Sequence, residues 1–220
     1  MSQKIPPSPQ PGLKEPKVTS KILKADGGFP NNERLPLLIY HGAFDLVQDD
    51  PASQIEAVFD SNVWGGMWRN GLHSHHHYHS NAHEVLGCYT GSARIQFGGP
   101  SGIITTLEAG DVVIIPAGVA HKNAGSSANF RIIGAYPHGQ HNYDLRRGLP
   151  GERPKVDEHI ASVALPDSDP VYGASGPLVL EWKLMAKPRP QTAPSGVTLS
   201  KTPGKIEVSG ISKTQPPVGR

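Results

Sequence analysis

The sequence has a single cysteine, few aromatic residues and no long apolar run. Because Cys88 is alone, an internal disulfide cannot form, and nothing in the composition requires an oxidising compartment. The N-terminal stretch MSQKIPPSPQPGLKEP lacks the apolar core of a secretory signal, and no window approaches the length of a membrane span. We therefore expect a cytoplasmic protein with no membrane partner.

An excess of one charge is also missing, since 21 Lys and Arg nearly balance 19 Asp and Glu. The ends are basic, because residues 1–30 and 183–220 hold 12 Lys and Arg against 3 Asp and Glu, which leaves 9 against 16 for residues 31–182. These basic residues stand singly among Pro, Ser, Thr and Gly, without a run of charge or stacking aromatics. The pattern indicates solvated ends and no nucleic-acid partner.

Glycine and proline, by contrast, are plentiful, with 25 Gly and 22 Pro, and they predict many turns and few long helices. We expect an N-terminal arm over residues 1–28, partly extended or disordered, with an edge strand at Val18–Leu23. A single domain should cover residues 29–182. A Pro/Ser/Thr/Lys-rich tail over residues 183–220 is expected to be disordered.

One helix and several strands are predicted in the body. Asp50 followed by Pro51 is a good helix start, and the apolar stripe of Ile55, Val58 and Phe59 predicts a helix over residues 51–61. A shorter helix is expected near 157–164. Short β-type runs separated by turn residues predict strands at 35–40, 84–89, 93–97, 103–107, 112–115, 119–123 and 130–136, with a closing strand at 178–182. This spacing favours an all-β sandwich or barrel.

Six of the eleven histidines fall between residues 73 and 83. On a strand, His77 and His79 would point to the same face and could place two imidazoles in one cavity. Glu84 would begin the next strand, and His121 follows a later turn. Three imidazoles and one carboxylate suit Fe, Mn, Ni, Cu or Zn rather than calcium. Other His-x-His pairs occur in the segment, so an exposed histidine-rich loop without a site is the competing interpretation.

Two spacings resemble the motifs of the cupin superfamily. The first is Gly71, five residues, His77-Tyr78-His79, four residues, Glu84, six residues, Gly91. The second is Gly110, five residues, Pro116, one residue, Gly118, two residues, His121. One position departs from the family pattern, because Gly125 stands where an asparagine is frequent and the nearby Asn123 cannot be assumed to replace it.

Several further segments are similar to the single-domain YjlB-like cupins, over about residues 29–182. They include Trp64-Gly65-Gly66-Met67-Trp68-Arg69-Asn70-Gly71, Gly134-Ala135-Tyr136-Pro137 and Asp169-Pro170-Val171-Tyr172-Gly173. The resemblance implies a single cupin β-barrel of the RmlC-like, double-stranded β-helix or jelly-roll type, with a few short helices. It also implies that His77, His79, Glu84 and His121 are metal ligands.

Other polar residues are weaker candidates. Arg69, His83 and Tyr136 are possible catalytic or substrate-orienting residues, although His83 should face away from the ligands and lie, like His73, His75 and His76, at the rim or surface. Arg94 and Gln96 fit an outward polar face equally well. Cys88 is expected to be a small buried hydrophobe rather than a nucleophile. Trp64 and Trp68 should pack as a lid or core edge.

The resemblance leaves three functions open. The first is a mononuclear non-haem Fe(II) oxygenase acting on a small organic molecule. The second is a non-redox isomerase, epimerase, decarboxylase or hydrolase in which a nearby base, such as a rim histidine, moves a proton. The third is a non-catalytic ligand-binding or storage protein, since cupins host many functions. A homodimer through an edge strand is possible, and the segment 18–23 could serve it.

Overall fold

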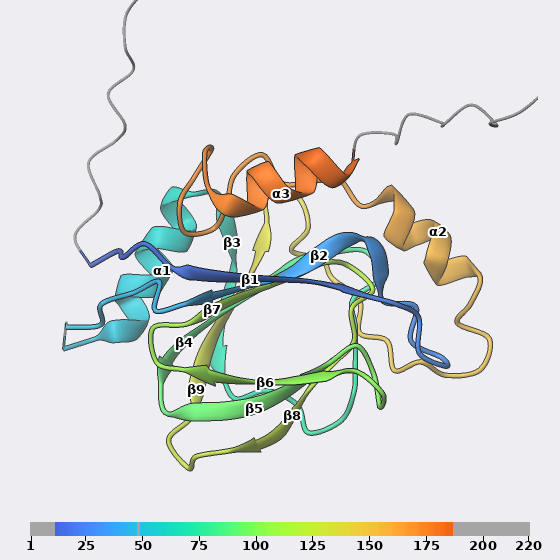
Figure 1. The fold of residues 1–220 in the computed structure, drawn as a ribbon, viewed down its shortest axis with the longest axis horizontal. Helices are drawn as coiled ribbons and strands as arrows, with labels where there is room; N and C mark the ends of the chain where they lie inside the picture. The colour runs from blue at the N-terminus through green and yellow to red at the C-terminus, as the bar shows by residue number, and fades with distance from the viewer. Residues whose placement is uncertain (1–11, 48, 187–220) are drawn as a thin grey trace, which may run out of the picture. The chain divides into compact units, whose positions relative to one another are not determined.

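The computed structural model describes residues 12–47 and 49–186. Nine strands and three helices lie within these ranges (Figure 1). The strands are β1 (Lys17–Leu23), β2 (Asn32–His41), β3 (Trp64–Asn70), β4 (Glu84–Thr90), β5 (Ser92–Phe97), β6 (Ile103–Glu108), β7 (Val112–Ile115), β8 (His121–Ser126) and β9 (Arg131–Pro137). The helices are α1 (Pro51–Ser61), α2 (Lys155–Ser162) and α3 (Pro177–Ala186).

The strands form two antiparallel sheets that pack face to face. The larger sheet has the order β1-β2-β7-β4-β9-β3, and the smaller one has the order β6-β5-β8. Figure 1 shows the smaller sheet below the larger one, with α1 and α3 on the opposite side of the larger sheet. The prediction of an all-β barrel or jelly roll with short helices is therefore confirmed.

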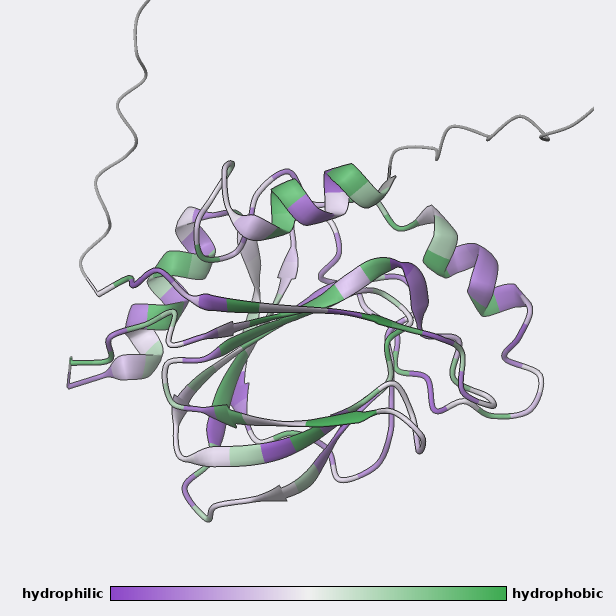
Figure 2. Ribbon diagram, viewed as in Figure 1, coloured by the Kyte–Doolittle hydropathy of each residue, from purple (hydrophilic) through white to green (hydrophobic). Residues whose placement is uncertain are grey.

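The central strands of the larger sheet, β2, β7, β4 and β9, are largely buried on both faces, which explains their apolar runs. In β2, Leu38 and Tyr40 pack in the cluster that includes α1 and α3, whereas Leu37 and Ile39 face the smaller sheet. Leu86 in β4 likewise faces the interior between the sheets. Figure 2 shows hydrophobic residues concentrated along these central strands, while α2 is largely hydrophilic. The space between the sheets forms the interior of the barrel.

The two predicted helices are confirmed, with small shifts in the bounds of the second. In α1, the Asp50 side chain accepts a hydrogen bond from the Ser53 N–H (3.2 Å), and Pro51 occupies the first turn. The buried side chains Ile55 and Phe59 belong to the apolar cluster between the larger sheet and the helices α1 and α3. The helix therefore forms because its cap and its apolar stripe agree.

One predicted element was wrong, and one strand had not been predicted. Residues 178–182 lie in helix α3 rather than in a closing strand, since Leu178 and Trp182, four positions apart, are both buried. A short apolar run fits a buried helix as well as a strand. Strand β3 had not been predicted, because its two glycines break the β pattern. It pairs with β9 through an irregular register between Gly65 and Trp68.

The predicted arm contains one strand of the sheet, and the second predicted boundary crosses a helix. Strand β1 lies within the arm predicted for residues 1–28, and it pairs with β2 as the expected edge strand. Helix α3 extends past the boundary predicted at residue 182. Residues 1–11 of the predicted arm and 187–220 of the predicted tail lie outside the described residues.

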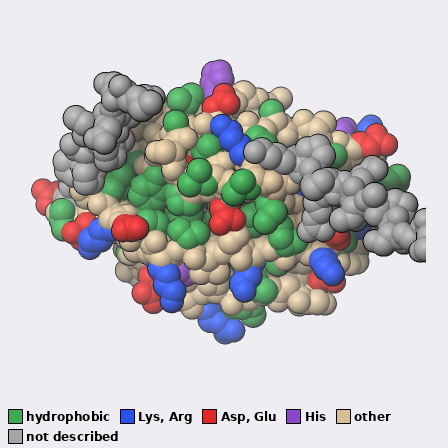
Figure 3. Space-filling model, turned by 45° about the horizontal axis from the view of Figure 1, so that its top comes forward, with side chains coloured by type: hydrophobic (Ala, Val, Ile, Leu, Met, Phe, Trp, Pro, Cys, Tyr) green, Lys and Arg blue, Asp and Glu red, His purple; other side chains and the backbone are tan. Residues whose placement is uncertain are grey.

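Helix α3 and strand β1 carry exposed apolar side chains. Leu180, Leu184 and Met185 of α3 and Val18 and Ile22 of β1 are all at least one third exposed, and hydrophobic side chains gather on the face that Figure 3 shows. Within the described residues, β1 pairs with β2 alone, so the homodimer stays a prediction. Among the helices described, none combines the length and apolar character that a membrane crossing requires.

Candidate metal centre

The histidine-rich segment between β3 and β4 is extended but forms no regular strand. His77 and His121 pair through two backbone hydrogen bonds, of 3.2 and 2.9 Å. Tyr78 forms an equivalent pair with Arg146. Neighbouring side chains alternate in such an extended segment, so His77 and His79 point to one side, and Tyr78 packs in a separate apolar cluster.

Three buried imidazoles meet at one point inside the barrel. One ring nitrogen each of His77, His79 and His121 lies within 4.8 Å of the other two. The Glu84 carboxylate reaches the same point, since its Oε2 is 3.2 Å from Nε2 of His121 and 3.5 Å from Nε2 of His79. The structure thus brings together all four residues predicted from the sequence, and the three histidines can hold a metal ion.

The other nitrogen of each ring faces a backbone carbonyl. Nδ1 of His79 hydrogen-bonds to the carbonyl of Asp144, and Nδ1 of His77 and of His121 lies 3.4 and 3.0 Å from the carbonyl two residues earlier. A carbonyl only accepts hydrogen bonds, so Nδ1 carries the hydrogen in each neutral ring. This leaves the Nε2 lone pair directed at the shared point, the usual arrangement of histidine ligands.

Three atoms at this point are buried without a hydrogen-bond partner. They are Nε2 of His79, Nε2 of His121 and Oε2 of Glu84. Buried polar atoms without a partner are rare and need an explanation. A divalent cation bound among them would satisfy all three, and nitrogen donors with one carboxylate suit a transition metal. The residues present therefore fit a metal site.

The protonation states of His77 and Glu84 agree with this interpretation, whereas Glu84 favours a proton on His79 that a metal ion would have to displace. Burial lowers the pKa of His77 to about 2, which keeps its imidazole neutral as a metal ligand must be. Burial acts to raise the pKa of Glu84, but His79 and His121 lower it well below its ordinary value. Burial acts to lower the pKa of His79, and the Glu84 carboxylate raises it overall. The site therefore carries its negative charge on Glu84.

Tyr136 holds the Glu84 carboxylate from β9. Its hydroxyl donates to Oε1 of Glu84 (2.8 Å) and accepts from Nε1 of Trp68 (3.1 Å). Burial raises the pKa of Tyr136 above its ordinary value, so the phenol keeps its proton. The Trp68 indole lies close to Gly134, where an added Cβ would come within 2.2 Å of the ring. Tyr136 thus positions a candidate ligand.

A cavity of about 440 Å³ is lined by three of the four residues, His77, His79 and Glu84. Its lining includes Trp68 and Tyr136, together with Tyr143 and Leu145, which the sequence did not single out. The Tyr143 ring stacks on Tyr136, with centroids 4.1 Å apart, and lies 4.8 Å from the His79 ring. Both missed residues follow β9 in a loop without periodicity, so no sequence signal marked them.

Asp144, in the same loop, anchors it to the histidine segment. Its carboxylate accepts hydrogen bonds from the N–H and the hydroxyl of Ser80, both at 2.6 Å, and from Nε of Arg146 (2.7 Å). Its carbonyl accepts from His79. The loop that walls the cavity is therefore fixed to the segment that supplies two of the imidazoles.

Arg69 lines the cavity but is already paired. Its Nε and one terminal nitrogen donate to the two carboxylate oxygens of Glu56, both at 2.7 Å, in a bidentate arrangement. The same terminal nitrogen contacts the Ser53 hydroxyl (3.0 Å), and Asp50 lies 3.5 Å away. Arg69 therefore has the expected location without a free guanidinium for substrate.

His83 is not the rim or surface residue predicted from the sequence. It is only 1% exposed, faces away from the four residues as expected, and packs against Trp182 with centroids 4.7 Å apart. Its Nδ1 accepts the Ala117 N–H (2.9 Å), and burial lowers the pKa of His83 to about 3. Alternation with its neighbour Glu84 correctly predicted that His83 faces the other way. His83 is buried rather than exposed because α3, which had been predicted as a strand, covers it.

The turn that precedes His121 is held by two asparagines at the start of β2. Oδ1 of Asn31 accepts the Ala120 N–H (3.0 Å), and Nδ2 of Asn32 donates to the Ala117 carbonyl (3.1 Å). Gly118 has φ +89°, and an added Cβ there would lie 2.5 Å from the Asn31 carbonyl oxygen. The turn therefore needs its glycine, and the asparagines fix where β8 and His121 begin.

The remaining histidines of the cluster do not join the four residues. His73 is exposed and lies at the rim of the cavity, 4.9 Å from the His75 ring. His76 turns away and packs on Phe29, with centroids 5.3 Å apart. The exposed-loop interpretation therefore applies to part of the segment only.

The other weak candidates occupy structural positions. Cys88 is fully buried between the sheets, as expected for a small buried hydrophobe, and burial raises the pKa of its thiol to about 12. Arg94 points outward, and Gln96 donates to the Pro100 carbonyl (2.9 Å). Trp64 is buried in the apolar cluster between the larger sheet and the helices α1 and α3. The Asn123 side chain accepts the Gly125 N–H within β8 (2.7 Å).

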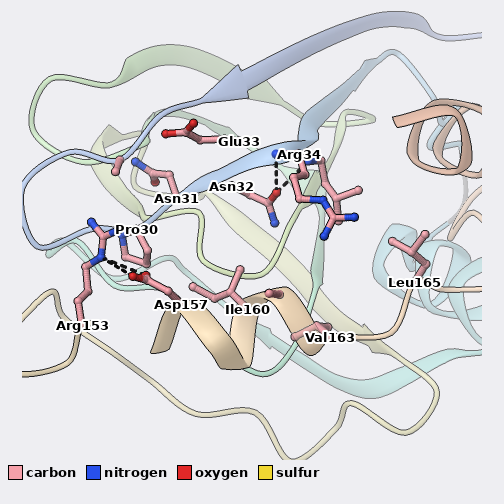
Figure 4. Close-up of a pocket in the computed structure, with 13 residues that line it drawn as sticks. Pro30, Asn31, Asn32, Glu33, Arg34, Arg153, Asp157, Ile160, Val163 and Leu165 are labelled. Carbon is pink, nitrogen blue, oxygen red and sulfur yellow. Dashed lines mark hydrogen bonds and ion pairs between the residues drawn. The ribbon is translucent and has the colours of Figure 1, made fainter. Parts of the chain in front are cut away.

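A second hollow of about 470 Å³ lies between the start of β2 and α2. Figure 4 shows the Arg34 guanidinium near Val163 and Leu165, at the opposite end from the Arg153–Asp157 ion pair (3.0 Å). None of the four predicted ligands lines it. The residues suited to chemistry are in the smaller cavity.

The fold and the site together define a cupin. A family model described as "Cupin" matches residues 64–160, the segment that contains all four predicted ligands. The chain is also 40% identical over 157 residues to a protein of Bacillus subtilis (strain 168) called "Uncharacterized protein YjlB", covering 71% of this chain and 92% of that relative. The chain therefore belongs to the cupin family.

Two solved structures are distantly similar to the chain. A Klebsiella pneumoniae protein with a double-stranded β-helix domain is 17% identical with a TM-score of 0.31, covering 63% of this chain and 83% of that one. An 11S allergen from Cocos nucifera is 22% identical with a TM-score of 0.32, covering 44% of this chain. The chain spans only 29% of the length of that allergen. These similarities carry no argument about function.

Proposed function

We propose that the protein is a metal-dependent cupin enzyme, a mononuclear non-haem Fe(II) oxygenase of a small organic molecule. The observation that supports it is the convergence of two buried, unpartnered Nε2 atoms and one carboxylate oxygen beside a cavity of about 440 Å³. His77, His79, His121 and Glu84 would hold the ion. When bound, such an ion supplies a Lewis acid and, in the case of Fe(II), electrons for dioxygen.

The protein's own part is positioning. Backbone carbonyls hold the three imidazoles in one tautomer, and Tyr136 holds the Glu84 carboxylate. Trp68 and Tyr143 line the cavity, and the Tyr143 ring stacks on Tyr136. Such support around the ligands usually sets both metal affinity and ligand orientation.

Redox chemistry is favoured because the cavity offers few free acids or bases. Arg69 is paired with Glu56, the Tyr136 hydroxyl is engaged by Glu84 and Trp68, and His83 is buried elsewhere. The three weak catalytic candidates are thus occupied. A reaction that relies on the metal rather than on a side-chain proton carrier fits this lining.

A non-redox isomerase, epimerase, decarboxylase or hydrolase is the second candidate, and His73 supports it. This imidazole lies at the cavity rim, with its ring centroid 4.9 Å from that of His77. It could move a proton on a substrate held beside the metal. His73→Gln should then remove turnover, whereas an oxygenase should retain it.

Metal content tests the proposal. Untagged protein purified without added metal should contain about one transition-metal ion per chain by elemental analysis, and His121→Ala should lose most of it. His138→Ala, at an exposed histidine outside the site, is the matched control and should keep its metal. His121→Ala protein that folds by circular dichroism and keeps full metal content would contradict the proposal.

Oxygen consumption separates the two candidates. Protein reconstituted with Fe(II) should take up dioxygen when a panel of small organic compounds is added, and it should show no turnover without air. Turnover that persists under anaerobic conditions would instead support the non-redox candidate. A metal-loaded protein that binds compounds without turnover in either atmosphere would indicate a ligand-binding cupin.

A further inference from the structure

The hollow between the start of β2 and α2 is lined by apolar side chains that are only half buried. Its volume of about 470 Å³ lies within the range of small-molecule sites. Ile160, Val163 and Leu165, from α2 and the segment after it, form its apolar wall. Of the described side chains in α2, only Val156 is buried. An apolar ligand in the hollow would therefore cover surface that the fold leaves open to water.

Arg34 supplies a positive charge to this hollow. Its guanidinium lies beside the apolar wall in Figure 4, and within residues 12–47 and 49–186 its side chain has no hydrogen bond or ion pair. Arg153, at the opposite end, is neutralised by Asp157 (3.0 Å). The Glu33 carboxylate points away from the Arg34 guanidinium in Figure 4. A guanidinium binds a carboxylate through two parallel hydrogen bonds, so the hollow combines an anion partner with an apolar wall.

The polar side chains in the floor of the hollow are already engaged by the protein. Nδ2 of Asn31 donates to two backbone carbonyls, at 2.7 and 2.8 Å. Oδ1 of Asn32 accepts two backbone N–H groups, at 3.0 and 2.8 Å. A ligand therefore needs a polar group only at the end that meets the guanidinium.

The two asparagines also hold the turn that precedes His121, through hydrogen bonds of 3.0 and 3.1 Å to its backbone. Helix α2 contacts the same turn, because an added Cβ at Gly118 would lie 2.8 Å from Cδ1 of Ile160. A ligand seated between β2 and α2 would thus touch side chains on both sides of the turn. Local opening of the turn would have to release the ligand, so a bound ligand slows that opening.

We propose that this hollow is a ligand site distinct from the metal centre, for a small monocarboxylate with an apolar body, and that its occupation stabilises the turn that places His121. The carboxylate pairs with Arg34, and the apolar body lies on Ile160 and Val163. None of the four candidate metal ligands lines the hollow, so its occupant is an effector rather than a substrate. Binding there does not require a bound metal.

Hexanoate is the probe for the ligand site, and hexanol is its neutral counterpart. In amide NMR spectra of the full-length protein, hexanoate should shift the amides of Ile160, Val163 and Leu165 saturably, with a Kd on the order of millimolar. Hexanol should bind at least about fivefold more weakly, and Arg34→Gln should weaken hexanoate binding by a similar factor. Glu33→Gln, at the neighbouring position, is the matched control and should bind hexanoate at least as tightly as the wild type.

Amide exchange measures the effect on the turn. The Ala120 N–H is held by Asn31, and with hexanoate at ten times its Kd its exchange should slow at least about threefold and up to about tenfold. The Gly125 N–H, held by Asn123 at the exposed end of β8, is the matched control and should exchange at an unchanged rate.

The outcomes separate the two parts of the proposal. The ligand site would be overturned by the absence of saturable shifts, by shifts confined to amides of the metal-site cavity such as Leu72 and Leu145, or by hexanoate affinity unchanged in folded Arg34→Gln protein. Saturable binding in the hollow with an unchanged rate of Ala120 exchange would overturn the effect on the turn.

Discussion

Removing the Tyr136 hydroxyl should weaken metal binding while leaving the fold intact. In Tyr136→Phe, the ring keeps its stacking on Tyr143, but Glu84 loses the 2.8 Å hydrogen bond that fixes its carboxylate. A hydrogen bond to a charged group contributes about 1.5–3 kcal/mol. The Trp68 indole N–H also loses its hydrogen-bond acceptor. Because Trp68 lines the cavity, its N–H can bond to water instead, so this second loss should have little effect on metal affinity.

The expected loss can be expressed as an affinity. Changes in the groups that support metal ligands typically lower metal affinity by about 10–100-fold, which corresponds to about 1.4–2.7 kcal/mol. This agrees with the hydrogen-bond figure. Competition of Zn(II) between the protein and a chromophoric chelator at fixed pH measures it directly. Tyr172→Phe, whose hydroxyl donates to the Lys14 carbonyl far from the site, is the matched control.

Two results would refute this reasoning. One is a Tyr136→Phe protein whose zinc affinity stays within twofold of wild type, since Glu84 would then not be a ligand held by Tyr136. The other is an equal loss in Tyr172→Phe, which would attribute the effect to general destabilisation. Thermal melts of both variants separate loss of fold from loss of affinity.

Further outcomes follow from the buried residues outside the site. Cys88 should resist thiol reagents in native protein at pH 8, because burial raises its pKa to about 12, and should react fully in denaturant; rapid native labelling would contradict its burial. His83→Ala leaves the Ala117 N–H without its acceptor and opens space beside Trp182. Urea unfolding should therefore show a free energy of unfolding lower by about 1–3 kcal/mol, whereas His159→Ala, at an exposed position, should leave it almost unchanged.

Much of the fold could be predicted because turn residues separate the strands. The strands at the core of the barrel are short apolar runs between glycines and prolines, and α1 carries both a cap and a stripe. The prediction for residues 178–182 was wrong because these signals were weak there. Residues 178–182 are apolar except for Glu181, and such a short run suits a strand as well as a helix. The helix packs against β2, where Trp182 donates to the Pro36 carbonyl (2.9 Å).

The site could be predicted only in part, for a related reason. Regular spacings mark His77, His79, Glu84 and His121, and the structure brings them to one point. The side chains around them come from distant segments without periodicity. Tyr143 owes its place to a loop anchored through Ser80, and the pairing of Arg69 depends on how α1 packs against β3. Such contacts are properties of the tertiary fold.

The identity of the atoms around the metal tests the central claim most directly. X-ray absorption of stoichiometrically Zn(II)-loaded protein should show a first shell of three imidazole nitrogens and at least one carboxylate oxygen, at about 2.0–2.2 Å. Loss of one imidazole from that shell in His79→Ala would assign it. A shell with fewer than three imidazoles in the wild-type protein, or a shell unchanged by His79→Ala, would contradict the account.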